Sequence, residues 1–68
     1  MNNEIVKKEE QRKIINICMY ICDYYSITIE DIANKLNIGI YEFNVMRNKC
    51  PNRLLFELIN LLNEMEGV

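Results

Sequence analysis

The sequence predicts an all-α fold, a compact bundle of four helices. Three observations predict it. Apolar residues recur at the three- and four-residue spacing of a helix through most of the 68 residues. No run alternates apolar and polar residues for long enough to form a strand, and residues typical of helix ends divide the chain into four stretches. A chain of this length has apolar surface for one core, so we expect a single domain over residues 1–68.

The first helix is expected at residues 3–24, with Asn2 or Asn3 as its N-cap. Its first half carries charges of both signs, which predicts a solvated surface. Over residues 14–25 the apolar side chains cover an arc of roughly 220° around the helix axis. One packing partner needs less apolar surface than this, so the sequence predicts a further partner for this helix.

The second helix, at residues 29–36, has the clearest start. Thr28 offers a capping hydroxyl, and acidic residues follow in the first turn, where the helix dipole favours them. Asn37 tolerates the left-handed conformation that ends a helix, and Gly39 suits the turn or the next cap. We therefore expect a tight turn and a third helix at residues 40–48.

Pro51 separates the third helix from a fourth, at residues 52–65, because proline disfavours helix at the residue before it and cannot donate a helix hydrogen bond. The fourth helix carries one broad apolar stripe. Its members are Leu54, Leu55, Leu58, Ile59, Leu61, Leu62 and Met65. Phe56 is set apart from this stripe and is expected to be exposed.

Two short helices joined by a tight turn keep a fixed angle only if a small residue lets them approach and apolar residues fill the wedge between them. Ala33 is the small residue. The expected wedge residues are Ile32, Leu36, Ile38, Phe43 and Met46. In this pattern, residues 29–48 resemble the helix-turn-helix of bacterial and phage repressors. Asn37 departs from it, since glycine is preferred there, but asparagine is the next best residue for positive φ.

Residues 32–52 and the leucine-rich helix after them resemble the lambda-repressor/Cro-like family. The long apolar first helix resembles the N-terminal domain of tetracycline-repressor-type regulators. These resemblances imply that the third helix enters the major groove of DNA and that its outward side chains read base edges. Those side chains are Ile40, Tyr41, Asn44, Val45 and Asn48. Asparagine pairs with adenine and apolar groups contact thymine methyls, so an AT-leaning site is expected.

The resemblance also implies phosphate contacts, from Thr28, Lys35, Arg47, Lys49 and Arg53. The residues from Lys35 to Arg53 hold four cations against one anion, Glu42, in a chain whose net charge is −2. An anionic partner is therefore expected to meet the middle of the chain. The acidic balance and Glu42 also leave open that these cations are ordinary solvated charges.

The sequence does not favour an enzyme or a cofactor. It contains no histidine, no glycine-rich phosphate loop and no serine nucleophile elbow. Cys18 and Cys22 share a helix face, where packing is a commoner role for cysteine than metal or redox chemistry, and Cys50 leaves the count odd. No signal peptide and no membrane span is recognisable, so we expect a cytoplasmic protein.

The surplus apolar surface predicts a homodimer, which would present two recognition helices to double-stranded DNA. The expected interface residues are Ile15, Met19, Leu58, Leu61 and Met65. The function predicted is that of a small dimeric, sequence-specific DNA-binding regulator of a phage, plasmid or other mobile element. Two alternatives stay open: a partition or accessory DNA-binding protein, and a protein-interaction module, such as an inhibitor or antirepressor, built on the same scaffold.

Overall fold

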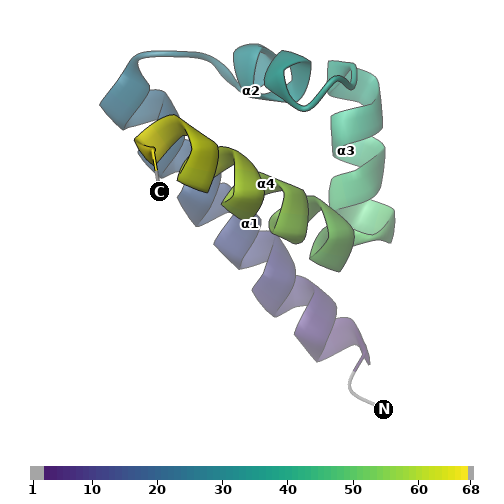
Figure 1. Cartoon of the computed structure of the whole chain (residues 1–68). Coiled ribbons are helices and arrows are strands. Elements are labelled where there is room, and N and C mark those ends of the chain that lie inside the picture. Colours follow the sequence, from purple (N-terminus) through teal and green to yellow (C-terminus); the bar gives the residue numbers. More distant parts are fainter. Residues whose placement is uncertain (1–2, 68) are drawn as a thin grey trace.

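The computed structural model describes residues 3–67 and folds them into four helices (Figure 1). The helices are α1 (Asn3–Tyr25), α2 (Ile29–Lys35), α3 (Ile40–Lys49) and α4 (Pro51–Glu66). The all-α prediction is confirmed, and each helix ends within one residue of its predicted bounds. Asn3 is the first residue of α1 rather than its cap, and Asn2 lies outside the described residues.

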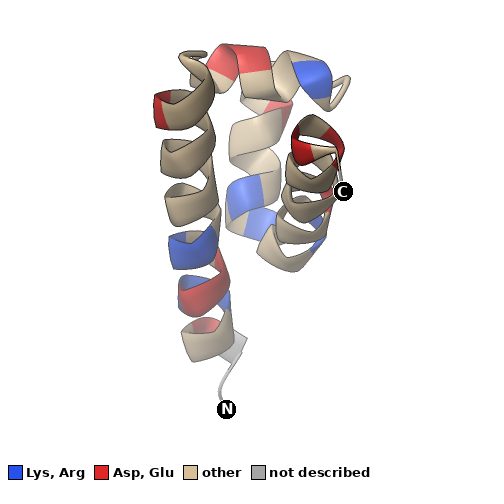
Figure 2. Ribbon diagram, turned by 60° about the vertical axis from the view of Figure 1, so that its left-hand side comes forward, with Lys and Arg blue, Asp and Glu red and all other residues tan. Residues whose placement is uncertain are grey.

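Helices α1 and α4 lie side by side and run in the same direction, while α2 crosses one end of this pair and α3 runs back toward the start of α4 (Figures 1 and 2). The contact between α1 and α4 is the most extensive in the molecule. It is reinforced near their C-terminal ends, where the Tyr20 hydroxyl donates a hydrogen bond to Glu66 Oε2 at 2.8 Å. No helix in residues 3–67 is both long enough and apolar enough to cross a membrane.

The expected helix boundaries form for the expected reasons. Thr28 caps α2, and α2 ends in a Schellman motif, with the Ile38 N–H donating to the Ala33 carbonyl at 3.0 Å. This motif requires a left-handed residue, and Asn37 supplies it with φ of 64°. Gly39 is the N-cap of α3, and Pro51 occupies the first turn of α4, where a missing N–H costs nothing.

The core is formed by one apolar face from each helix. Its buried members are Ile14, Cys18, Ile21, Ile32, Ala33, Phe43, Leu54, Leu58 and Leu61. The residues expected between α2 and α3 all belong to this core region: Ile32, Ala33 and Phe43 are buried in it, and Leu36, Ile38 and Met46 are partly buried and pack against it. This packing holds α3 by one side and leaves the other side in solvent. Phe56 is exposed on α4, as predicted.

Candidate functional site

Helix α3 presents an exposed face on the side opposite its buried Phe43. Tyr41 is 80% exposed, and Asn44 and Asn48 are exposed one turn apart on the same helix. Val45 is half-buried and lies between them along the chain. At 100° per residue, these four side chains fall within the half of α3 that faces away from Phe43. Four of the five predicted base-reading residues therefore share one face.

Ile40 is the exception. Its side chain is half-buried and packs against the core, so the prediction that it points outward is wrong. The reason is its spacing: Ile40 lies three residues before the buried Phe43, which places both on the inner side of α3.

The predicted phosphate contacts do not form one cluster. Lys35 lines a hollow between α2 and α4 together with Glu57 and Glu64. Arg53 lines a different hollow, between α3 and α4, with Glu42 and again Glu57. Each of these cations thus has carboxylates beside it, Glu57 lining both hollows, and their phosphate contacts stay a prediction. Figure 2 shows basic and acidic residues interspersed over the bundle.

Lys49 is the predicted cation best placed beside the exposed face of α3. It is exposed and lines a hollow at the C-terminal end of α3 with Lys7 and Glu10 from α1. Sequence reasoning overlooked Lys7, because it is separated from Lys49 by most of the chain. The end of α3 that carries Asn48 and Lys49 thus has a second cation, Lys7, and one carboxylate, Glu10, near it.

The backbone N–H and the hydroxyl oxygen of Thr28 are both engaged with Asp31. Its hydroxyl accepts a hydrogen bond from the Asp31 N–H at 3.1 Å, and Asp31 Oδ2 accepts one from the Thr28 N–H at 3.0 Å. Hydrogen bonding of the Asp31 carboxylate to Thr28, first of all to its backbone N–H, holds the pKa of this carboxyl below its usual value. A carboxylate therefore lies at the start of α2, where it repels a phosphate, and the phosphate contact of Thr28 stays a prediction.

The predicted dimer-interface residues separate into two groups. Ile15 and Met19 are 46% and 59% exposed on α1. Leu58 and Leu61 belong to the core, and Met65 is half-buried against it. The expectation for Leu58 and Leu61 is corrected: the side of the α4 stripe that carries them is covered by α1 within one chain, so it has no surface left for a partner.

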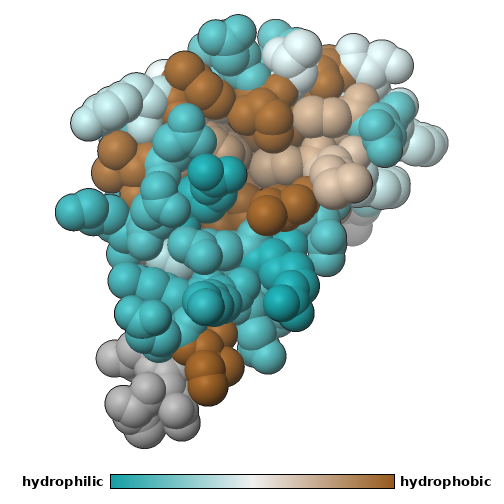
Figure 3. All heavy atoms as spheres, turned by 180° about the vertical axis from the view of Figure 1, so that it is seen from behind, coloured by the Kyte–Doolittle hydropathy of each residue, from teal (hydrophilic) through white to brown (hydrophobic). Residues whose placement is uncertain are grey.

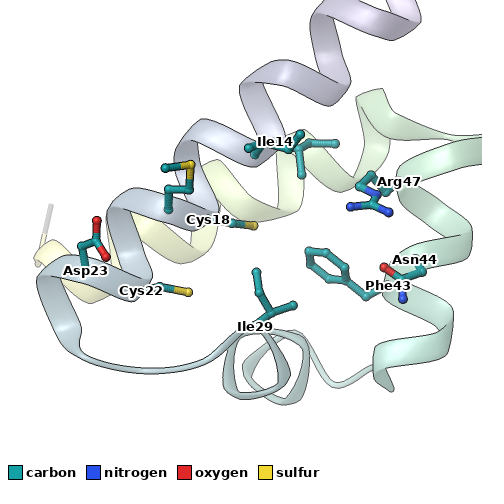
Figure 4. Close-up of a pocket in the computed structure, with 10 residues that line it drawn as sticks. Ile14, Cys18, Cys22, Asp23, Ile29, Phe43, Asn44 and Arg47 are labelled. Atoms are coloured by element: carbon teal, nitrogen blue, oxygen red, sulfur yellow. The ribbon is translucent and has the colours of Figure 1, made fainter.

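An open apolar groove of about 340 Å³ lies between α1 and the α2–α3 pair (Figure 4). Its walls are lined by Ile14, Ile15, Cys18, Met19, Cys22, Asp23, Ile29, Phe43, Asn44 and Arg47. Asp23 marks one end of the groove and Arg47 lies on the α3 side, with an apolar floor between them (Figure 4). The apolar surplus of residues 14–25 predicted a partner for this surface, but only the fold brings Ile29 and Arg47 to it.

Arg47, a predicted phosphate contact, is half-buried in this groove instead of standing on the outer face of α3. Its backbone carbonyl accepts a hydrogen bond from Gln11 Nε2 at 3.0 Å. Its side chain lies on the same groove wall as Asn44, so it borders the exposed face without belonging to it. Reversing its charge would therefore disturb the groove as well as any DNA contact.

Both groove thiols have a raised pKa, which favours their protonated form. Burial raises the pKa of Cys18 to about 11, and the neighbouring Cys22 adds to this rise while Arg47 opposes it. The pKa of Cys22 is also raised, first by burial and then by Asp23. In residues 3–67, no three cysteine, aspartate or glutamate side chains lie close enough together to hold a metal ion. The groove offers a ligand shape and apolar contact, with Asp23 and Arg47 as its charged groups.

Comparisons of this chain with protein-family models, with curated proteins and with solved structures gave no match. The candidate site has two parts. One is the exposed face of α3, with Lys49 at its end, and the other is the apolar groove on the adjacent side of the same helix.

Proposed function

We propose that the protein is a small DNA-binding regulator that inserts the exposed face of α3 into the major groove and acts as a homodimer. The observation that carries the proposal is that Tyr41, Asn44 and Asn48 are exposed on one face of a helix whose other side is fixed in the core. A rigidly held helix of this kind suits base-edge recognition, because side chains must meet the bases in a defined register.

The charges restrict how such contact is made. Glu30 and Asp31 lie in the first turn of α2 and Glu42 in the first turn of α3, where they repel phosphates. Lys49 lies at the opposite end of α3, where Lys7 and Glu10 share its hollow and leave two cations against one anion. We therefore expect phosphate contact to centre on the C-terminal end of α3. Few cations take part, so one chain binds weakly and two chains are needed for useful affinity.

Binding to duplex DNA enriched from a random pool, measured by fluorescence anisotropy at two salt concentrations, tests this proposal. Replacing Asn44 and Asn48 together by alanine removes two amide contacts to bases, and we expect at least a tenfold loss of affinity for the enriched sequence, as each good base contact contributes about 1–3 kcal/mol. The matched control replaces Asn60 and Asn63, two exposed amides on α4. Equal effects of both double variants would overturn the proposal.

A charge-reversal pair adds a second measurement. Lys49→Glu should weaken binding to every duplex. It should also make binding less dependent on salt: the slope of log affinity against log salt concentration should become shallower by about one unit for each phosphate that is no longer neutralised. Lys35→Glu makes the same charge change beside α4 and should leave affinity nearly unchanged. If both variants bind as the wild type does, phosphate contact at the end of α3 is excluded.

The apolar groove favours a second candidate, a protein-interaction module such as an inhibitor or antirepressor. The groove is lined by Ile15, Met19 and Ile29, which are all more than a third exposed. Such a module would show no salt-dependent DNA affinity and would tolerate Lys49→Glu. The same variant therefore separates the two functions.

A further inference from the structure

Helix α1 carries a self-complementary stripe beside the apolar groove. The stripe is formed by Arg12, Ile15, Asn16, Met19 and Asp23, which are all exposed. At 100° per residue these five positions fall within an arc of about 100°, and they repeat at the three- and four-residue spacing of helix pairs. The stripe thus has an apolar middle, a cation at its N-terminal end and an anion at its C-terminal end.

These charges determine which arrangement of two copies is favourable. If two α1 helices packed parallel, Arg12 would lie beside Arg12 and Asp23 beside Asp23, and like charges in contact oppose association. If they pack antiparallel about a two-fold axis between Ile17 and Cys18, each Arg12 lies opposite Asp23 of the partner subunit. The symmetry then provides two opposite-charge pairs, which lie about 16 Å apart along the helix axis.

The middle of the stripe suits the same arrangement. Ile15 and Met19 lie between the two charged positions, so an antiparallel pair brings the Ile15 and Met19 side chains of both copies together. Both residues also line the wall of the groove, and a helix placed across them covers that apolar surface from water. Figure 3 shows hydrophobic atoms gathered in the upper part of the face opposite that of Figure 1, above a largely hydrophilic lower part.

We propose that the occupant of this surface is a second copy of the chain, bound through an antiparallel α1–α1 contact in which Arg12 pairs with Asp23 of the partner subunit. The inference rests on the proposed dimeric state and not on DNA binding. Tyr41, Val45 and Asn48 do not line the groove, so the contact leaves most of the exposed face of α3 available.

Charge exchange tests the pairing directly. Arg12→Asp gives a chain with two acidic stripe ends, and Asp23→Arg gives a chain with two basic ends. Each variant alone should form dimers at least tenfold more weakly than the wild type, because both pairs become like-charged. An equimolar mixture should regain wild-type association as a heterodimer, since the two acidic ends of one chain then lie opposite the two basic ends of the other. The mass of each species is measured without DNA, by sedimentation and by native mass spectrometry.

Matched controls reverse exposed charges outside the stripe, with Lys13→Glu on α1 and Glu64→Arg on α4. Both should dimerise as the wild type does, and circular dichroism checks that every variant is folded. Weak homodimers of each variant together with a tight heterodimer establish the antiparallel pairing, because a parallel pair is like-charged already and would not be weakened by either exchange.

Three outcomes would each overturn the proposal: a monomeric wild type, dimers unaffected by either exchange, and a mixture that associates no more tightly than its components. Loss of DNA binding with dimerisation intact concerns the proposed function alone.

Discussion

Gln11 Nε2 donates a hydrogen bond to the backbone carbonyl of Arg47 at 3.0 Å and so joins α1 to the last turn of α3, 36 residues away along the chain. The carbonyls of a last helical turn have no partner within the helix, so a side chain from α1 satisfies one of them. The bond holds the end of α3 that carries Asn48 and Lys49. The proposed DNA-reading surface is thus positioned by α1 as well as by the turn before α3.

Replacing Gln11 by alanine should lower the free energy of unfolding by about 1 kcal/mol, the usual contribution of a part-buried hydrogen bond. Urea denaturation followed by circular dichroism measures this change. Asn63→Ala, which removes an exposed amide on α4, is the control and should change stability by less than about 0.5 kcal/mol. A Gln11→Ala variant as stable as its control would show that the bond contributes nothing.

The reciprocal bonds between Thr28 and Asp31 should be measurable as a helix cap. Thr28→Ala should cost about 1 kcal/mol of stability, since the Asp31 N–H loses its acceptor. Thr28→Ser keeps the hydroxyl and should retain most of the stability. Identical unfolding midpoints for the alanine and serine variants would argue against the cap.

The same contact predicts a pH dependence. The pKa of Asp31 is lowered in the folded chain, so its contribution is fully present above the pKa of the unfolded state, about 3.9, and is lost as pH falls through the folded pKa. Asp31→Asn removes this titration. Between about pH 6 and pH 2, the wild type should therefore lose more stability than Asp31→Asn does. Parallel stability curves for the two proteins would contradict the assignment.

Asn37 should be replaceable by glycine but not by alanine. Its φ of 64° lies in the left-handed region, where a β-carbon costs roughly 1–2 kcal/mol unless a short polar side chain compensates. Asn37→Gly should match or exceed the stability of the wild type, and Asn37→Ala should fall about 1 kcal/mol below it. Thermal unfolding of the three proteins measures the order of their stabilities. An Asn37→Ala variant as stable as Asn37→Gly would refute the strain argument.

Leu58 and Ile59 are neighbours in sequence but should differ widely on truncation. Leu58 is fully buried, so Leu58→Ala should cost about 2–5 kcal/mol through lost burial and a cavity, at every protein concentration. Ile59 is 43% exposed, and Ile59→Ala should cost less than about 1 kcal/mol. A loss for Leu58→Ala that vanished on dilution would instead place this side chain in an interface between copies.

The sequence alone was sufficient to predict the four helices and to place their ends within one residue. Local chemistry sets them: Thr28 can cap, Asn37 can adopt positive φ, and Pro51 cannot follow a continuing helix. Ser26 shows the limit of this reasoning. It also has positive φ, at 57°, although serine carries no signal for that conformation, and α1 ends just before it, one residue later than predicted.

Only the tertiary structure decided which residues share a surface. Periodicity assigns a side chain to a helix face but does not say which neighbour covers that face, so Leu58 and Leu61 were expected at an interface and lie in the core. Likewise, only the fold places Lys35 of α2 beside Glu57 and Glu64 of α4, and Arg53 of α4 in one hollow with Glu42 of α3. Hydrophobic and electrostatic contacts join residues that are distant in sequence. Which residues contact each other is therefore decided only when the helices pack.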